Sequence, residues 1–175
     1  MPDAIKIDQP LVLIGLMGAG KSTVGRRLAA RLDIAFVDSD DEIESAADCS
    51  ISDIFEIYGE PEFRALEKRV IDRLMGEGPM VLATGGGAFI NEQTRARVLE
   101  SGTSIWLNAD LDVLVERTSR RGGRPLLKTN DPRETLKKLI DERYPIYAKA
   151  NIIIDTNNDS MDSTVDKIID ALKKD

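Results

Sequence analysis

The chain has 175 residues, a mass of 19.3 kDa and a formal net charge of −7, which suits one folded domain. Histidine is absent, so catalysis by an imidazole base and metal sites with imidazole ligands are excluded. The acidic balance disfavours binding to many nucleic-acid phosphates, no apolar run is long enough to span a membrane, and the single cysteine, Cys49, fits a cytoplasmic location.

Short apolar runs alternate with helical spacing along the whole chain. The runs predict five strands, at residues 11–14, 35–37, 80–83, 103–107 and 152–154. Helices are predicted at 21–32, directly after residue 40, at 50–59, 60–75, 91–100, 110–120 and 133–149, and from residue 160 onward. This alternation predicts a single α/β domain, residues 1–175, with a five-stranded parallel sheet between two layers of helices.

The strongest chemical motif is the segment GLMGAGKST, which links the first strand to the first helix. Its pattern is G-x-x-x-x-G-K-[ST], in which the glycines let backbone N–H groups surround a polyphosphate. Lys21 is predicted to bridge the β- and γ-phosphates, and the Ser22 hydroxyl to ligate magnesium. The sequence therefore predicts a nucleotide site formed by Gly18, Ala19, Gly20, Lys21, Ser22 and Thr23.

Two carboxylates, Asp38 and Asp40, follow the second strand. Alternation along an extended segment places both on the same side, at the sheet edge where the phosphate loop also opens. One carboxylate would lie near magnesium, and the other would accept a hydroxyl proton during phosphoryl transfer. The alternative is that both residues only cap the helix that follows.

Two arginines on predicted helices are candidates for binding an anion. Arg64 lies four residues after Glu60 and three before Glu67, so a solvated ion pair is the alternative for it. Arg143 shares a helix face with apolar residues and is predicted to point inward, where a guanidinium needs an anionic partner.

Two glycine-containing segments complete the candidate site. Gly85, Gly86 and Gly87 follow the third strand and would let backbone N–H groups approach a ligand closely, unless they form only a tight turn. Residues 117–128 contain five cations and no acids, with Gly122 and Gly123 as hinges. A mobile lid is therefore predicted at about residues 118–132, with a basic surface loop as the alternative.

The motifs GLMGAGKST, FVDSD, FRALE, ATGGGA, RPLL and ERYPIY occur in this order. Together they resemble shikimate kinase, a family of P-loop folds of the nucleoside-monophosphate-kinase group. The resemblance covers nearly the whole chain, from the phosphate loop to the last strand. It implies a three-layer sandwich with strand order 2-3-1-4-5. It also implies an enzyme that transfers the γ-phosphoryl group of ATP to the 3-hydroxyl of shikimate, with Mg²⁺, in aromatic amino acid biosynthesis.

On the nucleotide side, the resemblance implies that Lys21 and Ser22 hold the ATP phosphates and magnesium. Asp38 would bind the metal through its water shell, and Arg117 would stack on the adenine. Arg124 would be a lid arginine that meets both the substrate carboxylate and the transferring phosphoryl group. Lys21, Asp40 and Arg124 are the residues expected to act in catalysis.

On the acceptor side, the resemblance implies a substrate-binding segment at about residues 38–66. Asp40 would contact the shikimate hydroxyls and orient or deprotonate the 3-hydroxyl. Arg64 and Arg143 would bind the shikimate carboxylate, with backbone N–H groups of Gly85, Gly86 and Gly87.

Two alternatives are a gluconate-type or nucleotide-type small-molecule kinase, which would share the loop and the fold, and a non-catalytic nucleotide-binding module. The charged set Asp38, Asp40 and Arg124 argues against the module, because a protein without catalysis has no reason to keep it together. We expect a cytoplasmic monomer that binds shikimate and neither nucleic acid nor a membrane.

Overall fold

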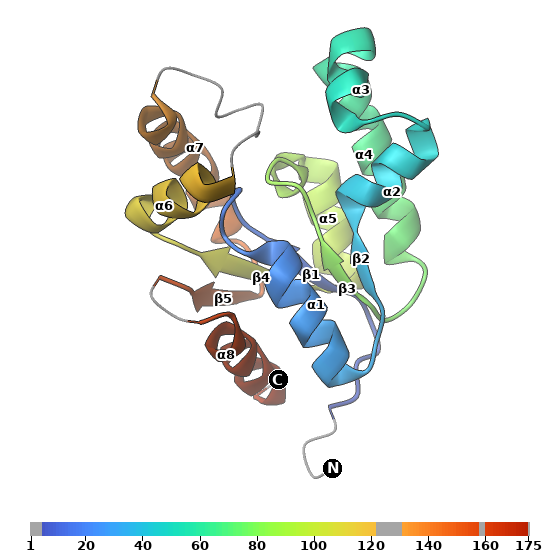
Figure 1. The fold of residues 1–175 in the computed structure, drawn as a ribbon. Coiled ribbons are helices and arrows are strands. Elements are labelled where there is room, and N and C mark those ends of the chain that lie inside the picture. Colours follow the sequence, from blue (N-terminus) through green and yellow to red (C-terminus); the bar gives the residue numbers. More distant parts are fainter. Residues whose placement is uncertain (1–4, 122–130, 158–159, 175) are drawn as a thin grey trace.

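The computed structural model describes residues 5–121, 131–157 and 160–174 of the chain. Its centre is a five-stranded parallel sheet in the order β2-β3-β1-β4-β5 (Figure 1), so the predicted strand order is confirmed. The strands are β1 Leu11–Ile14, β2 Phe36–Asp38, β3 Val81–Ala83, β4 Thr103–Asn108 and β5 Ile152–Asp155. Each lies within one or two residues of its predicted range.

Helices cover both faces of the sheet, which confirms the three-layer prediction (Figure 1). Helices α1 and α8 pack together on the near face in Figure 1, and α4 and α5 pack together on the far face. The helices are α1 Lys21–Leu32, α2 Ser39–Ala47, α3 Ile51–Tyr58, α4 Glu60–Met75, α5 Glu92–Ser101, α6 Leu111–Arg121, α7 Pro132–Tyr147 and α8 Met161–Lys173. In the described part of the chain, no helix is both long and apolar enough to cross a membrane.

Strand burial follows from position in the sheet. All four residues of β1, the central strand, are buried, because helices cover both of its faces and strands flank both of its edges. The edge strand β5 instead alternates: Ile152 and Ile154 are buried, whereas Ile153 is 48% exposed. The predicted caps Ser50 and Asn91 each accept a hydrogen bond from a backbone N–H three residues on, which fixes where α3 and α5 begin.

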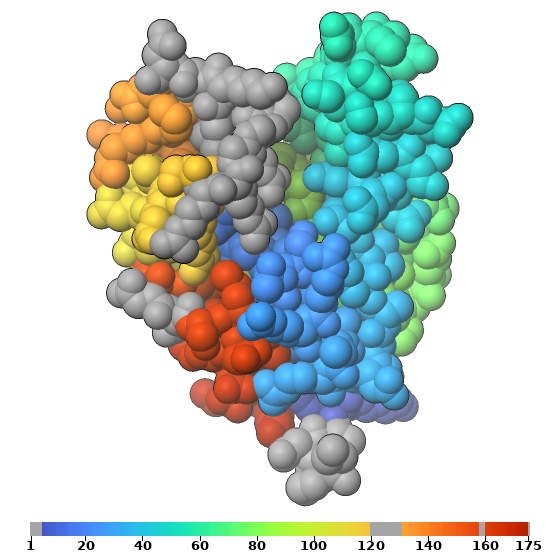
Figure 2. Space-filling model, in the orientation of Figure 1, coloured from blue at the N-terminus to red at the C-terminus, as the bar shows by residue number. Residues whose placement is uncertain are grey.

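The parallel sheet brings distant segments to one edge. Leu13 of β1 and Asp38 of β2 both pair with Ala83 of β3, so these three strands end at the same level. The phosphate loop, the carboxylates after β2 and the glycines after β3 therefore lie beside one another, as parallel α/β sheets require of a ligand site. Figure 2 shows α2 and α3 on one side of this end of the molecule and α6 and α7 on the other.

Candidate active site

The phosphate loop, residues 15–23, curls between β1 and α1. Gly18 and Gly20 have φ angles of +88° and +95°, a region that side-chain-bearing residues rarely adopt, so the curl requires glycine there. The Lys21 ammonium donates to the carbonyl oxygens of Gly15, at 2.6 Å, and Leu16, at 3.1 Å. Its charge is therefore held against the loop, where a polyphosphate cradled by the backbone would meet it.

Asp38 connects the phosphate loop to the start of α2. Its Oδ2 accepts a hydrogen bond from the Ser22 hydroxyl at 3.1 Å, and its Oδ1 accepts one from the Asp40 backbone N–H at 2.9 Å. Asp38 thus caps α2 and also faces the loop, so the capping alternative and the functional prediction are compatible for this residue.

The hydroxyl of Ser22 and the carboxylate of Asp38 suit magnesium, which prefers oxygen ligands and retains several waters. Within residues 5–121, 131–157 and 160–174, no group of three acidic or cysteine side chains could hold a metal ion. The chemistry of this small donor set fits an ion bound through one or two protein oxygens, with phosphate oxygens and water completing its coordination.

Arg117, on α6, lies against the outer side of the phosphate loop. Its guanidinium donates to the carbonyl oxygens of Gly18, at 3.2 Å, and Ala19, at 3.3 Å, and to that of Thr156, at 3.2 Å. Arg117 therefore joins the loop to the segment that follows β5. Stacking on adenine stays a prediction for this residue.

A cavity of about 440 Å³ opens beside the phosphate loop. Its apolar wall includes Phe55 of α3 and Phe63 of α4, whose rings meet edge to face with centroids 4.7 Å apart. Its polar lining includes most of the residues predicted to bind substrate: Asp40, Arg64, Gly85, Gly86, Gly87 and Arg143. Lys21, Ser22 and Asp38 line the same cavity, so the two predicted halves of the site are contiguous.

The glycine segment, residues 85–87, is surrounded by charged side chains. A Cβ atom at Gly85 would lie 3.3 Å from Asp40 Oδ1, one at Gly86 2.9 Å from Arg143 Nη1, and one at Gly87 2.5 Å from both terminal nitrogens of Arg64. Each charged group thus occupies space that a side chain would need. The segment leads into a 3₁₀ turn at Ala88–Ile90 that the sequence pattern did not reveal.

Arg64 forms the solvated i,i+4 ion pair with Glu60 that its spacing suggested, and it forms a second, buried pair with Glu67. Its Nη1 lies 2.8 Å from Glu67 Oε1, and its Nε lies 3.6 Å from Glu60 Oε1. The Glu67 side chain is only 3% exposed, whereas that of Glu60 is 65% exposed. The buried Glu67 therefore holds Arg64 in the cavity wall, and the remaining N–H donors of Arg64 are available to the cavity.

Glu67 is a site residue that our sequence analysis missed. Its second oxygen, Oε2, is buried without a hydrogen-bond partner in the described residues and lies 3.4 Å from the Cβ position of Gly85. Burial raises the pKa of this carboxyl, Arg64 opposes that rise, and the nearby charge of Asp40 adds to it. Glu67 comes four positions after Phe63 and three before Val70, which are both buried. Helical spacing could therefore have placed Glu67 on the buried face of α4.

Arg143 points inward, as predicted. It lines the cavity, and its guanidinium lies beside Gly86 together with the hydroxyl of Tyr147, one turn later on α7. The predicted lid at residues 118–132 falls largely outside the described residues, and Arg124 lies outside them.

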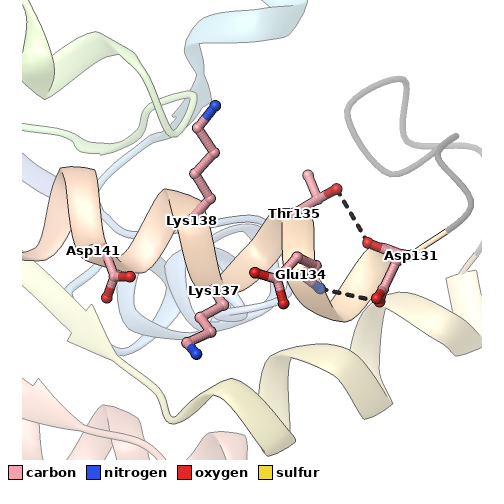
Figure 3. A pocket seen from close by; sticks show the side chains of 6 residues that line it. All are labelled: Asp131, Glu134, Thr135, Lys137, Lys138 and Asp141. Atoms are coloured by element: carbon pink, nitrogen blue, oxygen red, sulfur yellow. Dashed lines mark hydrogen bonds between the residues drawn. The ribbon is translucent and has the colours of Figure 1, made fainter.

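A second hollow, of about 420 Å³, lies along α7, and none of the residues that line it is a predicted site residue (Figure 3). The Asp131 side chain accepts a hydrogen bond from the Glu134 backbone N–H at 3.1 Å, and the Thr135 hydroxyl donates to the Asp131 carbonyl at 3.2 Å. These contacts begin the helix. Lys137 and Lys138 point away from each other (Figure 3), so the hollow does not gather its charges around one ligand.

The sheet order, the phosphate loop and the adjoining polar cavity define a P-loop kinase of a small molecule. A family model described as shikimate kinase matches residues 17–173. A shikimate kinase of Brucella canis is 54% identical over 162 residues, which cover 93% of this chain and 81% of that protein. The chain belongs to the shikimate kinase family.

Solved structures agree. A shikimate kinase from Acinetobacter baumannii in complex with shikimate superposes with a TM-score of 0.90 at 37% identity, covering 95% of this chain and 93% of that one. A gluconokinase from Sinorhizobium meliloti matches with a TM-score of 0.64 at 17% identity, covering 97% and 94%, a likeness of fold alone. The prediction of an enzyme that phosphorylates shikimate with ATP and Mg²⁺ in aromatic biosynthesis is thereby confirmed over the gluconate-type alternative.

Proposed function

We propose that the chain transfers the γ-phosphoryl group of ATP to the 3-hydroxyl of shikimate, in one site formed by the phosphate loop and the cavity beside it. The observation that carries this proposal is the gathering of Asp40, Arg64 and Arg143 around the glycine segment, in the same cavity as Lys21. One carboxylate and two guanidinium groups lining the same cavity suit an acid with hydroxyl groups, because fork-shaped donors bind its carboxylate and Asp40 accepts from its hydroxyls.

On the nucleotide side, backbone N–H groups of Gly18, Ala19, Gly20 and Thr23 would hold the phosphates, and Lys21 would stabilise the charge that develops during transfer. Ser22 and Asp38 would hold magnesium, directly or through water. When bound, that ion supplies charge neutralisation across the transferring phosphates. Arg117 already contacts the loop at Gly18 and Ala19 and would extend this side of the site to the adenine.

On the acceptor side, Arg64, Arg143 and the N–H groups of the glycine segment would bind the shikimate carboxylate. Phe55 and Phe63 would pack on the apolar face of the ring. Asp40 would then face the hydroxyl that attacks, and it would orient that hydroxyl and accept its proton as the oxygen bonds to phosphorus. Arg124 and the lid stay predictions.

The acceptor test is a coupled assay of ADP release with ATP, Mg²⁺ and either shikimate, gluconate or no acceptor. We expect shikimate to raise ADP release by about two orders of magnitude or more over water, because acceptor binding supplies proximity and orientation. Phosphorus NMR of the product should show the phosphate on the 3-oxygen. Equal turnover with gluconate, or a phosphate on another oxygen, would contradict the proposal.

Replacing Arg64 with alanine should raise the KM for shikimate about tenfold or more, because it removes a charged donor to the carboxylate. The KM for ATP should stay within about twofold, since Arg64 lies on the acceptor side of the cavity. Steady-state kinetics with each substrate varied in turn gives both values.

A matched control is Arg73→Ala on the same helix. Arg73 also pairs with a glutamate, Glu77, but the pair is exposed and outside the cavity. This variant should leave both KM values unchanged. A selective rise in the KM for ATP in Arg64→Ala would move Arg64 to the nucleotide side.

We also propose a single kinase domain over residues 1–175 that works as a cytoplasmic monomer and binds neither nucleic acid nor a membrane. The net charge of −7 supports the absence of nucleic-acid binding. The described residues of one chain supply both halves of the cavity, which supports a monomer.

A further inference from the structure

The hydroxyl of Tyr147 lies beside the glycine segment, and Tyr147 does not itself line the cavity. Tyr147 is fully buried at the end of α7, and its hydroxyl donates a hydrogen bond to the carbonyl oxygen of Gly86. The guanidinium of Arg143 lies beside the same glycine: a Cβ atom at Gly86 would lie 2.9 Å from Arg143 Nη1 and 3.6 Å from the Tyr147 hydroxyl. One buried phenol therefore lies beside two of the elements that form the acceptor side of the cavity.

The hydrogen bond from Tyr147 to Gly86 has a fixed direction. A carbonyl oxygen can only accept, so the Tyr147 hydroxyl is the donor. Burial raises the pKa of Tyr147 to about 12, so the hydroxyl keeps the proton that this bond requires.

The ring of Tyr147 is itself held in place. It packs against Trp106, with centroids 5.8 Å apart, and against Tyr144, with centroids 6.0 Å apart. Arg143 lies one helical turn before Tyr147, so both side chains lie on the same face of α7. The hydroxyl of Tyr147 therefore has a fixed position between α7 and the backbone of the glycine segment.

We propose that Tyr147 is a positioning residue for the acceptor: it fixes the backbone of Gly86 and the guanidinium of Arg143 relative to each other. Both groups then meet the same substrate carboxylate without rearrangement. The proposal rests on the proposed function, in which Arg143 and the glycine segment bind that carboxylate. Tyr147 does not line the cavity, so its effect on binding passes through Gly86 and Arg143.

Tyr144 offers a matched control on the same helix. Its ring packs against the same tryptophan, with centroids 4.9 Å apart, and its hydroxyl also donates to a backbone carbonyl, that of Ala109, at 2.5 Å. Burial raises its pKa as well. Ala109 follows β4 and does not line the cavity, so the Tyr144 hydroxyl contacts no acceptor-binding element.

The experiment compares Tyr147→Phe with Tyr144→Phe by steady-state kinetics and thermal unfolding. Each variant keeps its ring and loses one buried hydrogen bond, so both should fold and show similar falls in melting temperature. Tyr147→Phe should raise the KM for shikimate about fivefold and leave the KM for ATP within about twofold. Tyr144→Phe should leave the KM for shikimate within about twofold.

Combining Tyr147→Phe with Arg143→Ala separates positioning from loss of stability. If Tyr147 acts through Arg143, the double variant should bind shikimate little worse than Arg143→Ala alone, and any residual effect is that of Gly86. Equal effects of the two tyrosine variants on the KM for shikimate, or no effect of Tyr147→Phe, would overturn the proposal. If Arg64→Ala and Arg143→Ala also left that KM unchanged, the proposed carboxylate site itself would be wrong.

Discussion

Replacing Lys21 with methionine should lower kcat by about two to three orders of magnitude, the loss found when one preorganised donor to a developing charge is removed. Methionine keeps most of the length of lysine and removes only the charge. The Lys21 ammonium lies 2.6 Å from the Gly15 carbonyl, against the loop where the phosphates would lie. Because that charge acts mainly on the transferring group, ATP binding should weaken less than turnover.

The measurement is kcat from the coupled assay, with ATP binding by calorimetry and melting temperature as a check on folding. Lys138→Met is the control: this lysine is exposed on α7 and lines the second hollow (Figure 3). Its replacement should leave kcat unchanged. A Lys21→Met enzyme with normal turnover would refute the phosphate-loop assignment, and a slow Lys138→Met enzyme would give the second hollow a role.

Replacing Asp40 with asparagine should lower kcat about a hundredfold or more and change ATP binding little, because the amide keeps the shape but cannot take the hydroxyl proton. Asp40 lies in the first turn of α2 with its Oδ1 beside the glycine segment, whereas Asp38 accepts a hydrogen bond from the Ser22 hydroxyl. This geometry separates a role toward the acceptor from a role toward the metal.

The neighbouring Asp41→Asn is the control for Asp40→Asn. Asp41 is exposed in the same helical turn and does not line the cavity, so its loss should leave kcat unchanged. Varying Mg²⁺ adds a second test. If the defect of Asp40→Asn were relieved by high Mg²⁺, or ATP binding fell as much as turnover, Asp40 would be a metal residue and not the acceptor carboxylate.

Most elements could be predicted from the sequence because their signals are local. Four consecutive apolar residues predict β1. Ser50 and Asn91 fix the beginnings of α3 and α5 through hydrogen bonds to residues only three positions further along the chain. The strand order is not local and came from the family resemblance. The apolar residues of β5 predicted a strand but not its burial, which depends on its place at the sheet edge, where Ile153 is half exposed.

The candidate site was less predictable because its contacts join distant parts of the chain. Asp38 was expected either to cap a helix or to serve the metal, and only the folded chain shows that its two oxygens face Asp40 and Ser22 separately. The spacing of Glu60 and Arg64 gave their solvated ion pair, but not the second pair of Arg64 with the buried Glu67. The contact of the Tyr147 hydroxyl could not be predicted, because its hydrogen bond reaches across 61 residues to Gly86.

The three glycines after β3 also bear on how this enzyme could be altered. A methyl group at residue 85, 86 or 87 would displace a different charged partner, Asp40, Arg143 or Arg64. Libraries that seek a kinase for a new acceptor should therefore keep all three glycines and randomise the aromatic wall at Phe55 and Phe63. Substitutions at these two positions would change the space available to the ring of the acceptor. They would not move the side chains that bind the acceptor carboxylate.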